Sequence, residues 1–222
     1  AYRLKVGIEG VGGLPDFSKA DAGEMSTEAF LKERLGLSDA MVDTFFRPFY
    51  QGIFLADLSA QSSTLFDFVF RSLALGPTSL PRAGIQALSD AMARPVPAGA
   101  IRLNTAAARI GGDNAVHSAD GGMVRARAVV VATEGPAAVR LLGGELVPKP
   151  EGDRGSTTLY FGFEGRAPVE EPLLMLNGEG KGVVNNMFFP SAVSDAVAPA
   201  GMGLASVSVL GVNAGKSDEE LV

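Results

Sequence analysis

The chain has 222 residues, of which 46% are hydrophobic and 20% are charged, and its formal net charge is −6. This composition is typical of a globular protein with one large or two small domains, and it argues against an intrinsically disordered chain. The sequence has no basic stripe, so we expect no nucleic-acid partner, whereas a phosphate-bearing cofactor can still bind through backbone N–H groups.

The contents of cysteine and histidine exclude several kinds of site. Because the sequence has no cysteine, disulfides, thiolate metal sites, cysteine nucleophiles and a cysteine-linked flavin are impossible. The single histidine, His117, excludes multi-histidine metal sites and argues against a histidine-based triad. No apolar run approaches the ~20 residues of a membrane span. We therefore expect neither a metal site nor an integral membrane segment.

The first half of the chain is predicted to be helical. The N-cap candidates of the first three helices are Ser26 or Thr27, Ser38, and Ser62 or Ser63, and apolar residues follow at helical spacing. Glycine or proline is expected to end each helix, because glycine favours C-caps and proline cannot continue a helix. The four helices are expected between Ser26 and Gly36, Ser38 and Pro48, Ser62 and Gly76, and Gly84 and Pro95.

The second half of the chain is predicted to form mainly strands. The expected strands lie within residues 100–109, 115–118, 123–127, 128–132, 159–163, 173–176, 182–188 and 204–210. Turn signals at Asp120-Gly121-Gly122 and Asn177-Gly178 indicate hairpin connections. The apolar run 128–132 is typical of a strand buried on both faces. A helix is expected to begin at Pro136 and to end at Gly143-Gly144.

The two ends of the chain carry further signals. The glycine-rich residues 7–13 lack the G-x-G-x-x-G spacing of a dinucleotide loop, and Pro15 follows them, so a flexible connection is favoured over a phosphate loop. Near the other end, Ser217 and Glu220 have the spacing of a capping box. We expect the natural sequence to continue beyond both ends.

The densest aromatic stretch, Arg47–Leu55, has two interpretations. It can be core packing between two helices. It can also be the wall of an apolar cavity, in which Arg47, Tyr50 and Gln51 supply a few polar contacts. The residues alone leave both open.

Several segments together resemble one family, the flavin-containing amine oxidase superfamily, on its phytoene desaturase-like and protoporphyrinogen oxidase-like side. The resemblance depends on the order and spacing of these segments and covers roughly residues 25–222. The matching segments are Phe45–Leu55, Leu80–Gly84, Ile101–Thr105, Val129–Ala138, Asn185-Asn186 and Pro190-Ser191.

The resemblance implies an α/β fold of the mixed α+β kind. It would be part of a glutathione reductase-type FAD-binding fold together with a helical and mixed-sheet substrate domain. Residues 1–95 would be the helical part of the substrate domain, 96–150 the middle segment of the FAD-binding domain, and 151–222 the strands of the substrate domain with the start of a C-terminal helix.

The resemblance also implies FAD as the cofactor and assigns residues to its adenosine side. Ala107 stands where the family usually has the valine that contacts adenine, and it can serve because that contact is made by backbone groups. Ala132, Thr133 and Glu134 stand at the loop near the ADP portion.

Further residues are assigned to the flavin and to the substrate. Gly84 stands close to the flavin, although Ala83 replaces the first glycine of the family's usual pair. The residues assigned to the wall of the substrate cavity are Arg47, Phe49, Tyr50 and Gln51.

The function implied for the complete protein is an FAD-dependent oxidoreductase that transfers a hydride from a lipophilic small molecule to flavin. The chain lacks the family's G-x-G-x-x-G segment and its final FAD segment, so we expect the isolated chain to be inactive and to bind FAD weakly. The alternative is a non-catalytic module that lost the cofactor site and binds an apolar ligand or a protein partner.

Overall fold

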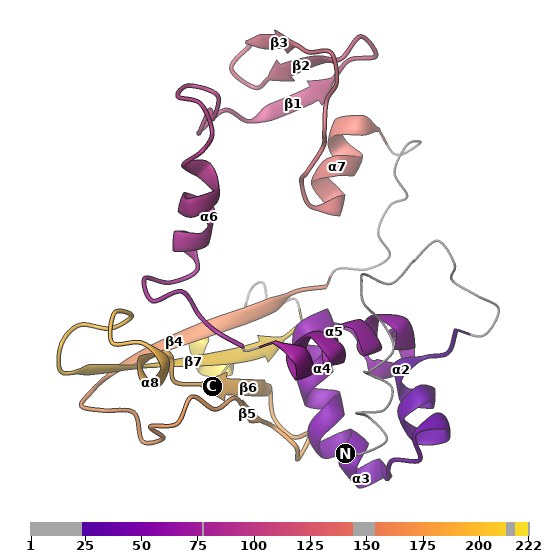
Figure 1. Cartoon of the computed structure of the whole chain (residues 1–222), viewed down its shortest axis with the longest axis vertical. Helices are drawn as coiled ribbons and strands as arrows, with labels where there is room; N and C mark the ends of the chain where they lie inside the picture. The colour runs from indigo at the N-terminus through magenta and orange to yellow at the C-terminus, as the bar shows by residue number, and fades with distance from the viewer. Residues whose placement is uncertain (1–23, 77, 144–153, 212–215, 222) are drawn as a thin grey trace. The chain divides into compact units, whose positions relative to one another are not determined.

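A computed structural model describes residues 24–76, 78–143, 154–211 and 216–221 (Figure 1). The chain divides into two compact units. Unit 1 comprises Ala1–Ala87 and Arg154–Val222, and unit 2 comprises Leu88–Asp153. The glycine-rich connection predicted at residues 7–13 lies outside the described residues, as does Gly144.

The helices of unit 1 begin where the sequence predicts. Ser26, Ser38 and Ser62 each lie at an N-cap, where the hydroxyl accepts a hydrogen bond from a first-turn backbone N–H. The helical elements are α2 (Thr27–Ala29), η2 (Phe30–Arg34), α3 (Asp39–Met41), η3 (Val42–Phe46), α4 (Arg47–Phe54), η4 (Leu58–Ala60) and α5 (Ser63–Leu75).

The prediction that Pro48 ends the second helix is wrong. The chain stays helical through Pro48 to Phe54, and Leu55 then turns away with a φ of 52°. The residues before Pro48 form a π-helical turn, in which the Arg47 N–H bonds to the carbonyl of Val42, five residues back. This wider turn places Pro48 in the first turn of α4, where a missing N–H is tolerated.

The helices of unit 1 enclose an aromatic core. The ring of Phe66 on α5 lies 4.7 Å from that of Tyr50 and 5.9 Å from that of Phe46. The buried cluster consists of Leu31, Val42, Phe46, Tyr50, Leu58 and Phe66. This packing fixes α4 against α5 and leaves the polar side chains of α4 on its outer faces.

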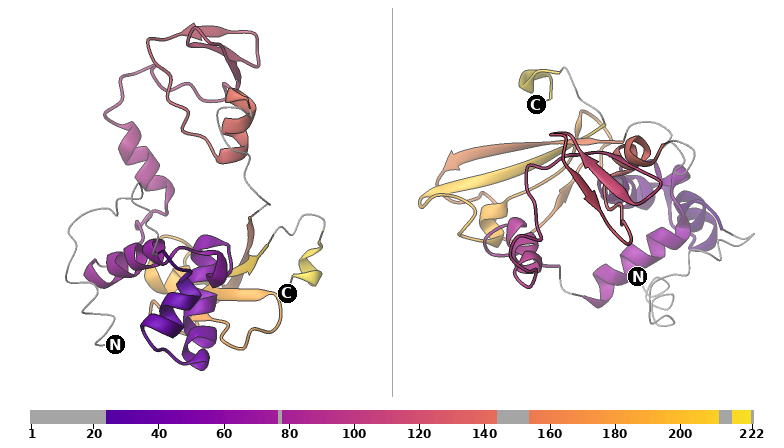
Figure 2. Two further views of the ribbon diagram at one scale, coloured as in Figure 1. Left: turned by 90° about the vertical axis from the view of Figure 1, so that its right-hand side faces the viewer. Right: turned by 90° about the horizontal axis from the view of Figure 1, so that it is seen from above.

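Unit 1 also contains an antiparallel sheet in the order β4-β7-β6-β5. Figure 2 shows β4 and β7 running side by side as the two long strands. The strands are β4 (Ser156–Glu164), β5 (Met175–Leu176), β6 (Val184–Phe188) and β7 (Met202–Leu210), and α8 (Pro190–Val193) follows β6. The predicted strands at 159–163 and 204–210 are confirmed.

The other two predicted strands of this sheet are shorter than expected. β5 begins only at Met175, because the chain turns just before it, where the Leu173 N–H bonds to the carbonyl of Glu171. β6 begins at Val184, since Gly182 has a φ of 74° and ends the preceding turn. The Asn177 amide holds the connection between them by donating to the carbonyl of Val184 at 2.7 Å.

Helix α4 packs on one face of the sheet. The Asn185 side chain donates a buried hydrogen bond of 2.9 Å to the carbonyl of Pro48. At the β5–β6 turn, a Cβ added to Gly178 would come within 2.8 Å of the carbonyl oxygen of Thr44. Successive strand residues point to opposite faces. The packing of α4 on this face therefore leaves the other face, which carries Ser206 and Ser208, for a different neighbour.

Unit 2 is smaller. Its sheet has the order β1-β2-β3, and α7 contacts β1. The elements are β1 (Ala107–Ile110), β2 (Ala115–Ser118), β3 (Met123–Arg125) and α7 (Gly135–Leu142), and α6 (Gln86–Ala93) crosses the boundary with unit 1. The hairpin turn at Gly121 and the end of α7 at Gly143 are confirmed, with φ values of 89° and 79°.

Two strand predictions in unit 2 are wrong. Around Ile101 and Leu103 the chain turns instead, because Asn104 adopts a φ of 55°, and the strand begins only at Ala107. Residues 128–132 form no strand, and Val130 is 88% exposed. A strand buried on both faces needs neighbouring strands, and none of the described residues pairs with this run.

The end of the described chain contains a short 3-10 helix, η5 (Asp218–Glu220). The Ser217 N–H donates a 2.8 Å hydrogen bond to the Glu220 carboxylate, which is one half of the predicted capping box. Among the described residues, no helix is long and apolar enough to cross a membrane. In the same residues, no three acidic, histidine or cysteine side chains are grouped to hold a metal ion.

Candidate functional site

Unit 1 contains a cavity of about 400 Å³ beside Gly84, which we call the Gly84 cavity. The turn that carries Leu80, Pro81 and Ile85 forms one wall. The sheet face opposite to α4 forms another wall, with side chains from β4, β6 and β7. Because apolar side chains supply most of the wall, the cavity suits a small molecule with an apolar body.

Hydroxyl groups line the sheet side of the Gly84 cavity. Thr158 and Ser208 are register partners on β4 and β7, and Tyr160 and Ser206 are the next partners on the same face. Register partners in an antiparallel sheet have Cβ atoms about 5 Å apart. The four side chains therefore start from neighbouring positions on one face of the sheet, and we call their hydroxyl groups the hydroxyl row.

Two contacts hold the turn at Gly84 near the end of α8. The Arg82 guanidinium lies 2.9 Å from the Asp195 carboxylate, and the Ser194 hydroxyl donates a 3.0 Å hydrogen bond to the Arg82 carbonyl. Both charged side chains are largely exposed, so the ion pair contributes at most ~1 kcal/mol. The turn is thus attached to the end of α8 at two points.

The backbone of Gly84 suits a close approach by a ligand. Its φ is +85°, which residues with a Cβ rarely adopt, and its N–H closes the turn by bonding to the Pro81 carbonyl at 2.9 Å. A Cβ built at Gly84 would have no atom within 4 Å. The space in front of this backbone is therefore open.

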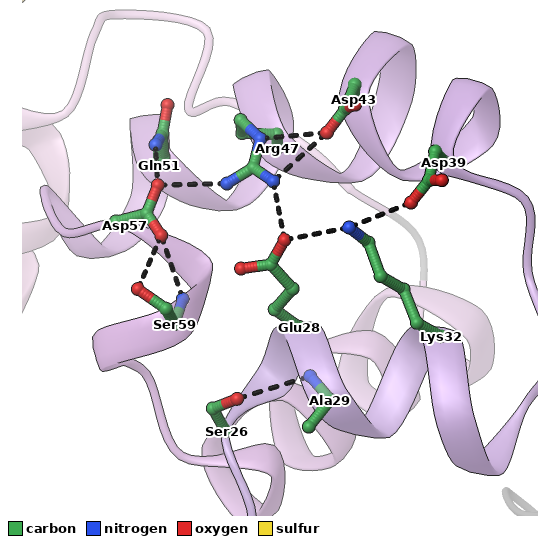
Figure 3. Close-up of polar contacts among 10 residues, drawn as sticks. All are labelled: Ser26, Glu28, Ala29, Lys32, Asp39, Asp43, Arg47, Gln51, Asp57 and Ser59. Carbon is green, nitrogen blue, oxygen red and sulfur yellow. Dashed lines mark hydrogen bonds and ion pairs between the residues drawn. The ribbon is translucent and has the colours of Figure 1, made fainter.

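A network of ion pairs surrounds Arg47 (Figure 3). Its guanidinium lies 2.9 Å from Glu28, 3.0 Å from Asp43 and 2.9 Å from Asp57. The Gln51 amide donates to Asp57 at 2.9 Å. Since three carboxylates already surround Arg47, its charge is compensated within the protein.

The network also lowers the pKa of Glu28 and of Asp57. Hydrogen bonds from Lys32, and then from Arg47, lower the pKa of Glu28. Burial acts to raise the pKa of Asp57, but the hydrogen bonds from Ser59 and the charge of Arg47 outweigh it, so the pKa of Asp57 is lowered. Glu28 and Asp57 therefore stay ionised to a lower pH than isolated carboxyl groups do.

The four residues assigned to the substrate cavity do not line one common space. Arg47 and Gln51 line a separate, more polar cavity of about 310 Å³. Tyr50 is fully buried in the aromatic core, and Phe49 packs against that core while its ring stacks on Phe45. None of the four lines the Gly84 cavity.

The residues assigned to the adenosine side of the cofactor lie in unit 2. Ala107 is the first residue of β1, which is an edge strand of its sheet. Ala132 and Thr133 precede α7, and Glu134 is its N-cap without capping it through the side chain. The contact of α7 with β1 brings these two segments into one packed group.

The hydroxyl row was missed in the sequence analysis. A signal for it exists, since Ser206 and Ser208 alternate with the apolar residues Ala205, Val207 and Val209. Alternation shows that the two serines share a face. It does not show that Thr158 and Tyr160, almost 50 positions earlier, lie beside them.

The sequence model described as flavin containing amine oxidoreductase matches residues 9–222. The chain belongs to this family. A search of curated proteins finds no match. The family membership confirms the resemblance seen in the segments around Phe45–Leu55, Leu80–Gly84 and Val129–Ala138, and it implies a flavin cofactor.

Solved structures similar to this family member support the fold. A protein from Pyrococcus furiosus superposes with a TM-score of 0.71 at 16% identity, covering 93% of this chain and 53% of its own. Reduced UDP-galactopyranose mutase superposes with a TM-score of 0.64 at 13% identity, covering 99% of this chain and 51% of its own. The chain spans about half the length of both proteins. The predicted mixed α/β fold class is confirmed.

Proposed function

We propose that the complete protein is an FAD-dependent oxidoreductase acting on a lipophilic small molecule, and that this chain supplies its substrate cavity and part of its cofactor site. Family membership over residues 9–222 supports the flavin. The observation that carries the proposal is the Gly84 cavity, where apolar walls meet an open glycine backbone.

The residues of unit 2 fit the adenosine side of FAD. Ala107 lies on an edge strand, so its outward backbone groups have no partner strand among the described residues and can bond an adenine ring. The first-turn N–H groups of α7 are not capped by the Glu134 side chain. Because the Glu134 carboxylate would repel a phosphate, we assign it to ribose hydroxyls and the N–H groups of α7 to the ADP portion.

In unit 1, Gly84 fits the flavin ring because the space before its backbone is open. Hydride acceptance is the chemistry that FAD supplies when bound. The chain's own side chains bind and orient the substrate. Leu80, Ile85 and Phe188 give the cavity an apolar wall for the body of the substrate, and the hydroxyl row fixes its polar end.

We propose an indirect role for the four residues first assigned to the substrate cavity. Tyr50 and Phe49 belong to the packing of α4, and Arg47 and Gln51 anchor its outer side to Asp57. Helix α4 in turn contacts the sheet through Pro48. Their substitution would therefore change the Gly84 cavity only through the position of the sheet.

The second candidate is a non-catalytic module that binds an apolar ligand. One observation favours it, because every lining residue of the Gly84 cavity comes from unit 1. The cavity thus exists without any residue assigned to the adenosine site. The visible absorption of oxidised flavin in the purified full-length protein separates the two candidates, since the module would carry none.

FAD titration with a matched pair of variants tests the cofactor assignment. Gly84→Ala and Gly165→Ala introduce a Cβ at φ values of +85° and +88°, and neither Cβ would have an atom within 4 Å. Their backbone strain should be the same, about 1–2 kcal/mol. We expect Gly84→Ala to weaken FAD binding about tenfold and Gly165→Ala to leave it unchanged. Equal FAD affinities of the two variants would show that Gly84 is not part of the FAD site.

The isolated chain gives a second test of the same assignment. We expect it to bind FAD weakly, because the residues assigned here to the adenosine side do not include a G-x-G-x-x-G loop for the pyrophosphate. Near-stoichiometric FAD on the isolated chain would contradict the proposed division of the site.

A further inference from the structure

The hydroxyl row has more hydrogen-bonding capacity than the protein uses. Thr158, Tyr160, Ser206 and Ser208 line the Gly84 cavity, and within the part of the chain that the structure describes none of their hydroxyls has a hydrogen-bond partner. Ser206 is only 5% exposed. Hydroxyl groups that make no bond within the protein are free to donate to or accept from a ligand that reaches the cavity.

Other serines around the same cavity differ from those of the row. The Ser191 hydroxyl bonds to both the N–H and the carbonyl of Leu204, at 3.0 and 3.4 Å. The Ser194 hydroxyl bonds to the Arg82 carbonyl. These two have structural partners, whereas the row faces the cavity without any. The contrast indicates that the row is available to a ligand.

The Gly84 cavity also lacks charge. None of its lining residues is acidic, basic or histidine. The charged side chains of the adjoining turn, Arg82 and Asp195, pair with each other instead of facing the cavity. An ion that leaves water for an apolar cavity loses its hydration, and without a counter-charge this loss is not offset. The cavity therefore disfavours ammonium and carboxylate groups.

We propose that the Gly84 cavity binds a neutral substrate with an apolar body and one oxygen function, an alcohol or a carbonyl, which the hydroxyl row holds. Hydroxyl side chains both donate and accept, so they serve either group. This inference rests on the proposed oxidoreductase function and narrows its substrate class. It separates this chain from a member of its family that would bind a charged amine in the same cavity.

Three probes of one chain length test the preference: octan-1-ol, octylammonium and octanoate, at neutral pH. Binding to the isotopically labelled chain is followed by the amide NMR shifts of β4 and β7. Octan-1-ol is expected to shift the amides around Ser206 and to bind at least about tenfold more tightly than either ion. An equal or greater affinity for octylammonium, or no shift with octan-1-ol, would overturn the proposal.

Variants test whether the hydroxyl row causes the preference for octan-1-ol. Ser206→Ala and Ser208→Ala should each weaken octan-1-ol binding about fivefold to tenfold, while binding of octane stays within about twofold. Ser156→Ala, on β4 but outside the cavity, is the matched control and should change neither. Thr158→Asp supplies a counter-charge and should reverse the preference toward octylammonium. Octan-1-ol binding unchanged in both serine variants would remove the row from the site.

The results distinguish a failure of this inference from a failure of the proposed function. If the full-length protein carries no flavin but the alcohol preference holds, the oxidoreductase proposal fails and the cavity remains a site for neutral ligands. If flavin is bound and octylammonium is preferred, the oxidoreductase proposal stands and the substrate class is wrong.

Discussion

The helical part of unit 1 and the described part of unit 2 use apolar residues in different ways. In the helices, a cluster of six side chains that includes Tyr50 and Phe66 is almost completely buried. In unit 2, Ala115 is the one buried apolar residue among those described, while Leu103 and Val130 are 79% and 88% exposed. The comparison teaches that apolar content alone does not make a core. Helical spacing collects these residues on one side, whereas the run 128–132 pairs with no strand among the described residues.

The largest loss of stability is expected from a substitution of Phe66. Phe66→Ala removes the ring at the centre of the helical core and should destabilise unit 1 by about 3–5 kcal/mol. Val130→Ala in unit 2 should change stability by less than about 0.5 kcal/mol. Urea denaturation followed by circular dichroism measures both. Similar losses of stability in the two variants would contradict the difference between the helical core and unit 2.

A smaller loss is expected from the ion network on the outer side of the same helices. Arg47→Met keeps most of the side-chain volume but leaves Glu28, Asp43 and Asp57 without their shared cation, and it should cost about 1–2 kcal/mol. The matched control is Arg166→Met, whose exposed pair with Glu170 should contribute close to nothing. The same denaturation experiment measures both variants. A loss of stability in Arg47→Met as small as that in Arg166→Met would mean that the network does not stabilise the fold.

An effect of opposite sign is expected inside the core. The Tyr50 hydroxyl is buried and has no partner among the described residues, and burial, with the charge of Asp67, raises the pKa of Tyr50. Tyr50→Phe removes this polar group and should raise the free energy of unfolding by up to ~1 kcal/mol. Tyr160→Phe should leave stability unchanged, because the Tyr160 side chain is 66% exposed. A loss of stability in Tyr50→Phe would show that the hydroxyl has a partner after all.

The smallest effect is a pH dependence. The folded-state pKa of Glu28 lies below its ordinary value of 4.5, and that of Asp57 lies below its ordinary value of 3.8. Their stabilisation is therefore fully present above about pH 4.5 and is lost as the pH falls through the lowered folded values. The stability difference between the native chain and Arg47→Met should shrink below pH 4.5. A constant difference down to pH 2 would contradict the assigned network.

Local signals in the sequence predicted much of this fold. Serine caps at 26, 38 and 62 and the glycine turns at 121 and 143 depend on neighbouring residues alone, so the sequence was sufficient for them. The continuation through Pro48 was not predicted, because it depends on a π-helical turn that shifts the hydrogen bonds before the proline. The exposure of Val130 depends on which strands are present as neighbours, and no local pattern contains that information.

The candidate site was less predictable than the fold. Gly84 was singled out by the family resemblance, and the structure places it at an open cavity. The hydroxyl row depends on the register between β4 and β7, which only the folded sheet determines. Arg47 and Gln51 were assigned to an apolar cavity because of their aromatic neighbours, but helical geometry turns them outward to Asp57 while Tyr50 points into the core.

The most direct test of the central claim is the visible absorption spectrum of the full-length protein during a titration with octan-1-ol. If the Gly84 cavity is the substrate cavity of a flavin-dependent oxidoreductase, oxidised flavin bands are present and the bound alcohol shifts them. The shift should be lost in Gly84→Ala and kept in Gly165→Ala. A protein without flavin bands, or flavin bands that octan-1-ol leaves unchanged while it binds to the hydroxyl row, would contradict the account.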